Sequence, residues 1–252
     1  LSLINQLLDM RKYDEGQMQL HFAETDLINF LMGPFELYTQ TAERRGIEFT
    51  FSHTMAEQPV WIDRDSIDKV MMNLLSNAFK YTPDEGTIEI DVEVGTDDHE
   101  KGPLRNYVEV SVSDTGIGLD KDDVNKIFDR FYRADNEFTS VTIGMGIGLN
   151  YSQMLIGMHH GTIKASGRHD GQSGSVFSFR LPLGNSHIAQ EDMVDAATVE
   201  RQQLERNRVS LSIDEPETGK QTKGSIKVLI VDDDDSMLDY LFDALKSSYK
   251  II

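Results

Sequence analysis

The sequence predicts an α+β domain, a two-layer α/β sandwich in which helices cover one face of a mixed, largely antiparallel sheet. Apolar and polar residues alternate along residues 87–94 and again along 108–112, the period-two pattern of strands buried on one face. Helical patterns flank these strands at 26–45, around position 73 and at 147–158. Such helices can cover the apolar face of the sheet, so the pattern favours two layers.

The first helical pattern covers residues 1–10, where apolar residues recur at positions 3, 4, 7, 8 and 10. It begins without a capping residue, so it is either an ordinary amphipathic helix or the end of a longer one. The next helix, 26–45, has Thr25 and Asp26 as candidate caps. Short strands are expected at 47–51, 60–62, 161–165 and 176–181.

Hydrophobic density falls between residues 184 and 225, which is the composition of a linker. Residues 191–208 within it could form a charged helix, but they have no strong apolar stripe. A mostly apolar strand follows at 226–231 and runs into the acidic residues 232–235. The polar stretch 95–106, between the two alternating strands, is expected to be a surface connection without function.

Composition restricts the possible functions. At 252 residues the chain exceeds a typical single domain, so one full domain plus further pieces is expected. The formal charge of −19 argues against a nucleic-acid partner. The absence of cysteine excludes disulfides and Cys-ligated zinc. The sequence contains no signal peptide and no apolar run long enough to span a bilayer.

Three short segments describe one nucleotide pocket by their order and spacing: 73–83 (NLLSNAFKYTP), 114–118 (DTGIG) and 144–149 (GMGIGL). In a helix, Asn73, Asn77 and Lys80 project from one face. The opposite face, which can lie on the sheet, consists of Ile67, Met71, Leu74 and Ala78. Amide oxygens and a cation suit Mg²⁺ bound together with a polyphosphate. A solvated polar face is an equal alternative on spacing alone.

The other two segments predict contacts with the base and the phosphates. Asp114 ends a buried strand, so its carboxylate needs hydrogen-bond donors. An adenine amine is one such donor. The alternative is a nearby backbone amide, in an Asx turn. Gly116 and Gly118 allow the backbone to approach the base. The glycines at 144–148 open an apolar helix, so their amides can face phosphate oxygens, although such a motif is often only a flexible turn.

Together with 128–133 (FDRFYR), these segments resemble the ATP-binding domain of bacterial sensor histidine kinases. The resemblance covers about residues 1–183 and implies the Bergerat-type fold of the GHKL superfamily, with ATP and Mg²⁺ as cofactors. Related ATPases of the gyrase, mismatch-repair and heat-shock chaperone types carry a catalytic Glu at the position of Asn73. An amide has no useful basicity, so Asn73 favours phosphoryl transfer to a protein side chain over hydrolysis.

The resemblance also implies individual roles. Asn77 is expected to bind the metal, and Asn73, Lys80 and Arg133 to act at the phosphates. Nucleotide contacts are expected from Asn73, Asn77, Lys80, Tyr81, Asp114, Gly116, Gly118, Phe128, Gly144, Gly146, Gly148, Leu149 and Ser175. Residues 129–143 are expected to form a mobile lid, although Phe128 and Phe131 could equally be core. Met145 departs from the family, in which this position is often Thr.

The implied organisation is an end of a dimerisation helix at 1–17, a catalytic domain at 18–184, a linker at 185–225 and the start of a receiver domain at 226–252. The last assignment rests on a resemblance of 226–252 to response-regulator receivers. The acceptor Asp of a receiver lies beyond this stretch, so no phosphorylation is expected here. Asp232 and Asp233 would bind Mg²⁺ in a complete receiver, whereas a solvated acidic turn is the expectation for this chain.

The expected activity is transfer of the ATP γ-phosphoryl group to a histidine on a dimerisation helix outside this chain. His159 and His160 follow a helix end without an acidic neighbour and do not fit the acceptor. The expected partners are the dimerisation and phosphoacceptor helices, the receiver and a second copy of the full-length protein, with no nucleic acid. The expected location is the cytoplasmic part of a bacterial inner-membrane receptor. The alternatives are a GHKL-type ATPase or a degenerate nucleotide-binding scaffold, the latter supported by Met145 alone.

Overall fold

The computed structural model describes residues 2–120, 123–124, 126–132, 146–168 and 173–195, together with the backbone of 227–228 and 250–251. The chain divides into two compact units, Leu1–Glu200 and Arg201–Ile252.

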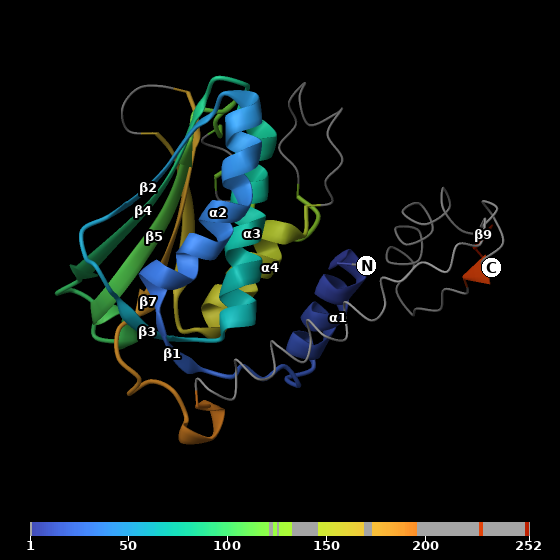
Figure 1. Cartoon of the computed structure of the whole chain (residues 1–252). Coiled ribbons are helices and arrows are strands. Elements are labelled where there is room, and N and C mark those ends of the chain that lie inside the picture. Colours follow the sequence, from blue (N-terminus) through green and yellow to red (C-terminus); the bar gives the residue numbers. More distant parts are fainter. Residues whose placement is uncertain are drawn as a thin grey trace, which may run out of the picture. The chain divides into compact units, whose positions relative to one another are not determined.

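A five-stranded sheet forms the first layer of the N-terminal unit (Figure 1). Its strands lie in the order β2 (Glu48–His53), β4 (Thr87–Thr96), β5 (Asn106–Asp114), β7 (Ser175–Pro182) and β6 (Thr162–Gly167). β2 runs parallel to β4, and the other neighbours are antiparallel. The predicted mixed, largely antiparallel sheet is therefore confirmed.

Three helices form the second layer and cover one face of this sheet: α2 (Leu27–Arg45), α3 (Arg64–Tyr81) and α4 (Gly148–Met158) (Figure 1). The alternating residues of β4 and β5 are buried on that face, as Ile90 and Val110 illustrate. The predicted cap of α2 is confirmed, because the Asp26 carboxylate accepts a hydrogen bond from the amide of Ile28. The predicted two-layer sandwich follows from this one-sided burial.

Helix α1 (Ser2–Asp14) packs on this unit and extends beyond the predicted 1–10. Met10 is buried in the common core, whereas Leu8 of the predicted apolar stripe is 51% exposed. The helix is also held by Asp9, whose carboxylate accepts hydrogen bonds from the Tyr151 hydroxyl at 2.6 Å and from Lys69 at 3.1 Å. In this structure α1 is therefore attached to helices α3 and α4.

The short strand predicted at 60–62 is confirmed, but the sheet that it forms with residues 23–26 was not predicted. β1 (Ala23–Asp26) pairs antiparallel with β3 (Pro59–Ile62), one strand preceding α2 and the other preceding α3. The sequence of β1, AETD, is too short to show a period-two pattern. Its pairing also depends on a distant partner, since Asp26 pairs with Pro59 and Ala23 with Ile62.

The stretch predicted to begin the linker is folded against the N-terminal unit up to residue 195. The Phe22 amide donates to the Asp192 carbonyl at 2.8 Å, and the Val194 amide donates to the Phe22 carbonyl at 2.9 Å. Ile188 is buried with Leu20 and Phe22 in a second small cluster. The polar composition of 185–195 does not indicate this attachment, because backbone hydrogen bonds and the two apolar side chains of Ile188 and Met193 are sufficient for it.

The second unit is described through two short strands. β8 (Lys227–Val228) and β9 (Lys250–Ile251) pair in parallel. In the stretch 191–208, whose helical state the sequence left open, Glu191 and Asp192 lie in the short 3₁₀ turn η2 (Gln190–Asp192), and residues 196–208 lie outside the described part. Among the described residues, no helix combines the length and apolar character needed to cross a membrane.

Candidate nucleotide-binding site

Helix α3 presents its predicted polar face away from the sheet. Ile67, Met71, Leu74 and Ala78 are buried on one side, as expected. Asn73, Asn77 and Lys80 on the other side are only partly buried. The helix ends at Tyr81, where the Thr82 amide donates to the Ala78 carbonyl at 3.0 Å, immediately before Pro83. Pro83 accounts for this ending, because proline has no backbone donor and its ring clashes with the preceding turn.

Asn73 brings the first and third predicted segments together. Its side-chain amide donates to the Ser152 hydroxyl on α4 at 2.8 Å. Its oxygen packs on Gly148, at a spot where a Cβ atom on that glycine would overlap it. Gly148 opens α4, so the start of this helix and the polar face of α3 lie against each other. Ser152 is fully buried and was not singled out from the sequence.

Asp114 lies at the end of β5 and is 3% exposed. One carboxylate oxygen accepts from the Gly116 amide at 2.8 Å, and the other accepts from the Ser175 hydroxyl at 2.5 Å. The Asx turn, which was the alternative interpretation of Asp114, is therefore present, and Ser175, which was expected to contact the nucleotide, donates to Asp114 directly. Burial raises the pKa of Asp114, although these hydrogen bonds and Arg168 act in the opposite direction.

The second predicted segment packs tightly against the end of the first. A Cβ atom on Gly116 would lie 2.5 Å from the Tyr81 carbonyl oxygen, so only glycine fits there. Gly118 has φ of +79°, which favours glycine as well. The Ser173 hydroxyl donates to the Gly116 carbonyl at 2.9 Å, and this contact was not predicted. The close approach holds the turn around Asp114 beside Tyr81.

The third and fourth segments also meet. The Phe131 amide donates to the Gly146 carbonyl at 3.0 Å, and the Asn150 side chain donates to the Phe128 carbonyl at 2.8 Å. Phe128 is 7% exposed and belongs to the core, whereas Phe131 is 52% exposed. The alternative that these two residues are part of the core is therefore correct for Phe128 and wrong for Phe131. The predicted nucleotide contact of Phe128 would have to involve its backbone or a small exposed part of its ring.

Some of the remaining predicted residues lie in the described part of the chain, and the others lie outside it. The Lys80 ammonium lies 5.0 Å from the centre of the Tyr81 ring, and Leu149 packs partly buried against the core. Arg133, Gly144, Met145 and the predicted lid beyond residue 132 lie outside the described residues.

His159 is buried and hydrogen-bonded within the fold. It is 1% exposed, its Nε2 accepts from the Asp63 amide at 3.1 Å, and its Nδ1 donates to the Leu155 carbonyl at 2.7 Å. Burial lowers the pKa of His159. Both ring nitrogens are occupied, which agrees with the expectation that His159 is not a phosphoacceptor.

The described part of the chain contains no cluster of three or more His, Cys, Asp or Glu residues placed to hold a metal ion. A metal at this site would therefore need ligands from amide oxygens and from the nucleotide itself, which is the arrangement that the α3 face suggests.

The fold and the site define an ATP-binding domain of a known class. Residues 62–185 match the family described as "Histidine kinase-, DNA gyrase B-, and HSP90-like ATPase". The match includes all three segments that surround Asn73, Asp114 and Gly148. This part of the chain is therefore a domain of that family.

Within the class, the similarity is to histidine kinases. The chain is 30% identical to "Histidine kinase P4" of Formosa agariphila over all of its own length and 18% of that protein. Among solved structures, the catalytic domain of the histidine kinase ThkA is 27% identical with a TM-score of 0.53, covering 65% of this chain and 96% of the other. Full-length ShkA is 25% identical with a TM-score of 0.58, covering 72% and 35%. The chain therefore carries a histidine kinase catalytic domain. The whole chain corresponds to less than a fifth of the length of Histidine kinase P4.

Proposed function

We propose that this domain binds Mg·ATP between α3 and the two glycine turns and transfers the γ-phosphoryl group to a histidine outside the chain. The observation that carries the proposal is the contact of Asn73 with Ser152 and Gly148. By the resemblance, Asn73 stands where a hydrolytic relative carries its general base, and this contact supports a role for its amide beside the third segment. An amide cannot activate water, so the site is suited to transfer rather than hydrolysis.

The Asp114 pocket fits an adenine ring. Its carboxylate accepts hydrogen bonds from the Gly116 amide and from Ser175, and the two oxygens, with about four acceptor sites between them, retain capacity for a further donor such as an exocyclic amine. The Gly116 amide donates to this carboxylate, so the glycine turn lies directly beside it. The full-length ShkA structure is a complex with AMPPNP, which supports an adenine nucleotide as the ligand of this domain type.

The polar face of α3 fits a metal bound with the phosphates. Asn77 would hold Mg²⁺, which supplies positive charge against the polyphosphate when it is bound. Lys80 would neutralise phosphate charge from the last turn of the same helix, and Asn73 would orient the terminal phosphate. The overall charge of −19 makes such local cations necessary for binding an anion.

The wider setting is a hybrid sensor kinase. The sequence 226–235 and the parallel pairing of β8 with β9 support the start of a receiver, because parallel strands require a crossover connection rather than a hairpin. In this proposal α1 ends a dimerisation helix of a homodimeric protein in the cytoplasmic part of a bacterial membrane receptor. The phosphoacceptor helix and the complete receiver are its partners.

Calorimetric titration with a non-hydrolysable ATP analogue, with and without Mg²⁺, tests the proposal. One saturable site that weakens without Mg²⁺, and that loses its Mg²⁺ dependence in Asn77→Ala, is expected. Incubation of the chain with radiolabelled ATP is expected to give no acid-labile phosphoprotein, and steady-state hydrolysis should be negligible. Rapid hydrolysis would favour the ATPase alternative, and the absence of binding would favour the degenerate scaffold.

A further inference from the structure

We propose that Arg45, which lies outside the nucleotide pocket, is a positioning residue that holds Lys80 and Tyr81 in their binding geometry. The inference rests on the proposed nucleotide site and assigns to it a residue from a different helix. Arg45 is the last residue of α2, and the chain turns away from it at Gly46, which has φ of +63°.

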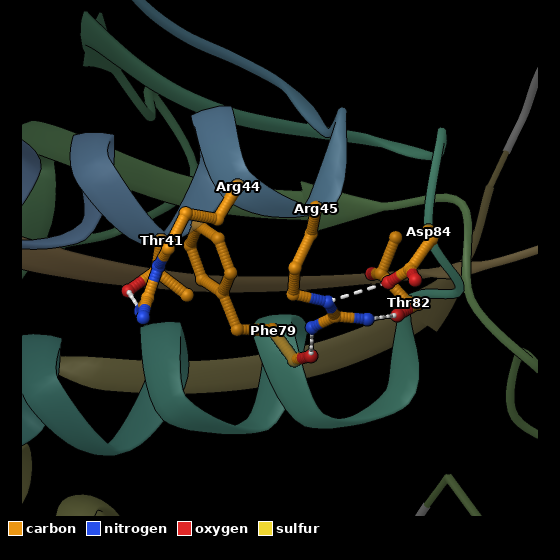
Figure 2. Close-up of polar contacts among 6 residues, drawn as sticks. All are labelled: Thr41, Arg44, Arg45, Phe79, Thr82 and Asp84. Atoms are coloured by element: carbon orange, nitrogen blue, oxygen red, sulfur yellow. Dashed lines mark hydrogen bonds and ion pairs between the residues drawn. The ribbon is translucent and has the colours of Figure 1, made fainter.

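The guanidinium of Arg45 closes the carboxyl end of α3 (Figure 2). Its Nη1 donates to the Phe79 carbonyl, and its Nη2 donates to the Thr82 carbonyl at 2.6 Å. Its Nε donates to the Asp84 carboxylate at 2.7 Å. The backbone of Arg45 takes part as well, because its carbonyl accepts from the Glu85 amide at 3.1 Å. The end of α2 is thus tied to the end of α3 and to the turn that follows.

These contacts satisfy groups that the helix itself leaves unpaired. The last carbonyls of a helix have no intrahelical partner, and a planar guanidinium can donate to several of them from fixed directions. The Asp84 side chain is 73% exposed, so the ion pair with it contributes little. The two partly buried bonds to Phe79 and Thr82 are therefore the important ones.

The two carbonyls enclose the residues expected to contact the nucleotide. Lys80 and Tyr81 are the only positions between Phe79 and Thr82 in the sequence, so fixing both carbonyls fixes the backbone of that pair. The Tyr81 carbonyl also lies against Gly116, beside Asp114. A displacement of this turn would therefore move the Lys80 cation and disturb the base-binding turn as well.

Arg44 provides a matched control. It neighbours Arg45 and carries the same charge, but it donates at 3.2 Å to Thr41 on its own helix (Figure 2). Replacing Arg44 with Met changes the net charge as Arg45→Met does, yet leaves the end of α3 untouched. A purely electrostatic effect of charge on nucleotide binding would appear equally in both variants.

The test is a double-substitution cycle measured by calorimetry with the ATP analogue and Mg²⁺. Arg45→Met is expected to weaken binding about tenfold, the effect of losing hydrogen bonds from a charged donor. Arg44→Met is expected to bind as the unsubstituted chain does. In a Lys80→Ala background, Arg45→Met should weaken binding clearly less than tenfold, because the part of the effect that acts through Lys80 is already lost and only the part that acts through Tyr81 remains. An exclusively structural role would give equal losses in both backgrounds and would overturn the proposal.

Thermal unfolding accompanies each variant. If Arg45→Met does not fold, Arg45→Lys replaces it in the cycle, because a single ammonium retains the charge but cannot reproduce the fork. Unchanged affinity in a folded Arg45 variant also overturns the proposal. Failure of the unsubstituted chain to bind nucleotide is a separate result, which overturns the proposed site itself and the role of Arg45 with it.

Discussion

The side-chain amide of Asn73 donates a 2.8 Å hydrogen bond to the buried hydroxyl of Ser152, and this contact links the polar face of α3 to the helix behind the glycine turn. With its nitrogen engaged by Ser152, the amide directs its oxygen toward Gly148. The orientation of a group expected at the phosphates therefore depends on a residue four positions into α4, outside every predicted motif.

Ser152→Ala is expected to weaken Mg²⁺-dependent nucleotide binding about fivefold, because the Asn73 amide loses the bond that orients it. Titration with the ATP analogue in the presence and absence of Mg²⁺ measures the effect. Ser178→Ala, on the face of β7 turned away from the helices, serves as the control and should bind normally. Equal affinities for both variants would contradict an orienting role for Ser152.

Asp114→Asn is expected to separate stability from binding. Burial raises the pKa of Asp114, so the folded state holds the proton more tightly than the unfolded chain does, and ionisation of this group destabilises the fold at neutral pH. The variant should therefore unfold at the same temperature as the unsubstituted chain or higher.

Nucleotide affinity of the same variant should fall about tenfold or more, because an amide has one acceptor oxygen where the carboxylate has two. In the unsubstituted chain, affinity should likewise decrease as the pH falls through the raised pKa of Asp114. Scanning calorimetry and titration across pH measure both quantities. A variant that is less stable but binds normally would show that Asp114 serves the fold alone.

His159 is expected to make stability depend on pH in the opposite direction. Burial lowers the pKa of His159, so the unfolded chain binds the proton more readily. Its contribution to stability should be complete above about pH 6.5 and should be lost as the pH falls below that value. Melting temperatures of His159→Gln should show a smaller decrease over this range.

The neighbouring His160 supplies the comparison for this prediction. His160 has φ of +57°, which Asn tolerates, so His160→Asn keeps the backbone conformation. This variant should retain the acid-induced decrease in melting temperature. If the decrease is lost in His160→Asn and kept in His159→Gln, the titrating group is His160, and the prediction for His159 is wrong.

Asp9 is expected to hold α1 on the domain more firmly than Asp14 does. Burial, followed by the hydrogen bond to Asp9, raises the pKa of Tyr151 to about 12, so its hydroxyl stays protonated and donates to Asp9. Asp14 instead pairs with Arg130 in a bridge with both side chains nearly half exposed, which contributes at most about 1 kcal/mol.

Hydrogen exchange of the α1 amides distinguishes the two carboxylates. Asp9→Asn should increase exchange throughout α1, whereas Asp14→Asn should leave it nearly unchanged. The two substitutions remove the same charge from the same helix, so each controls for the other. Faster exchange in Asp14→Asn than in Asp9→Asn would reverse the assigned importance of these contacts.

Most secondary structure could be predicted because its signals are local. The alternation along 87–94 predicts β4, and the polar and apolar faces of 64–81 predict how α3 lies on the sheet. The site chemistry is local in the same sense: Asp114, Gly116 and Gly118 share one turn, and the Asn73, Asn77 and Lys80 spacing belongs to one helix. Short-range periodicity and turn chemistry were sufficient for these features.

Tertiary structure alone decides which distant residues complete the site and its supports. Arg45 meets Phe79 and Thr82, Asn73 meets Ser152, and Phe22 pairs with 192–194. Each of these groups could form a hydrogen bond with many partners, so its sequence neighbourhood does not identify the partner. The partner is selected when packing of the helices on the sheet buries both groups together, because leaving either one unpaired there costs free energy.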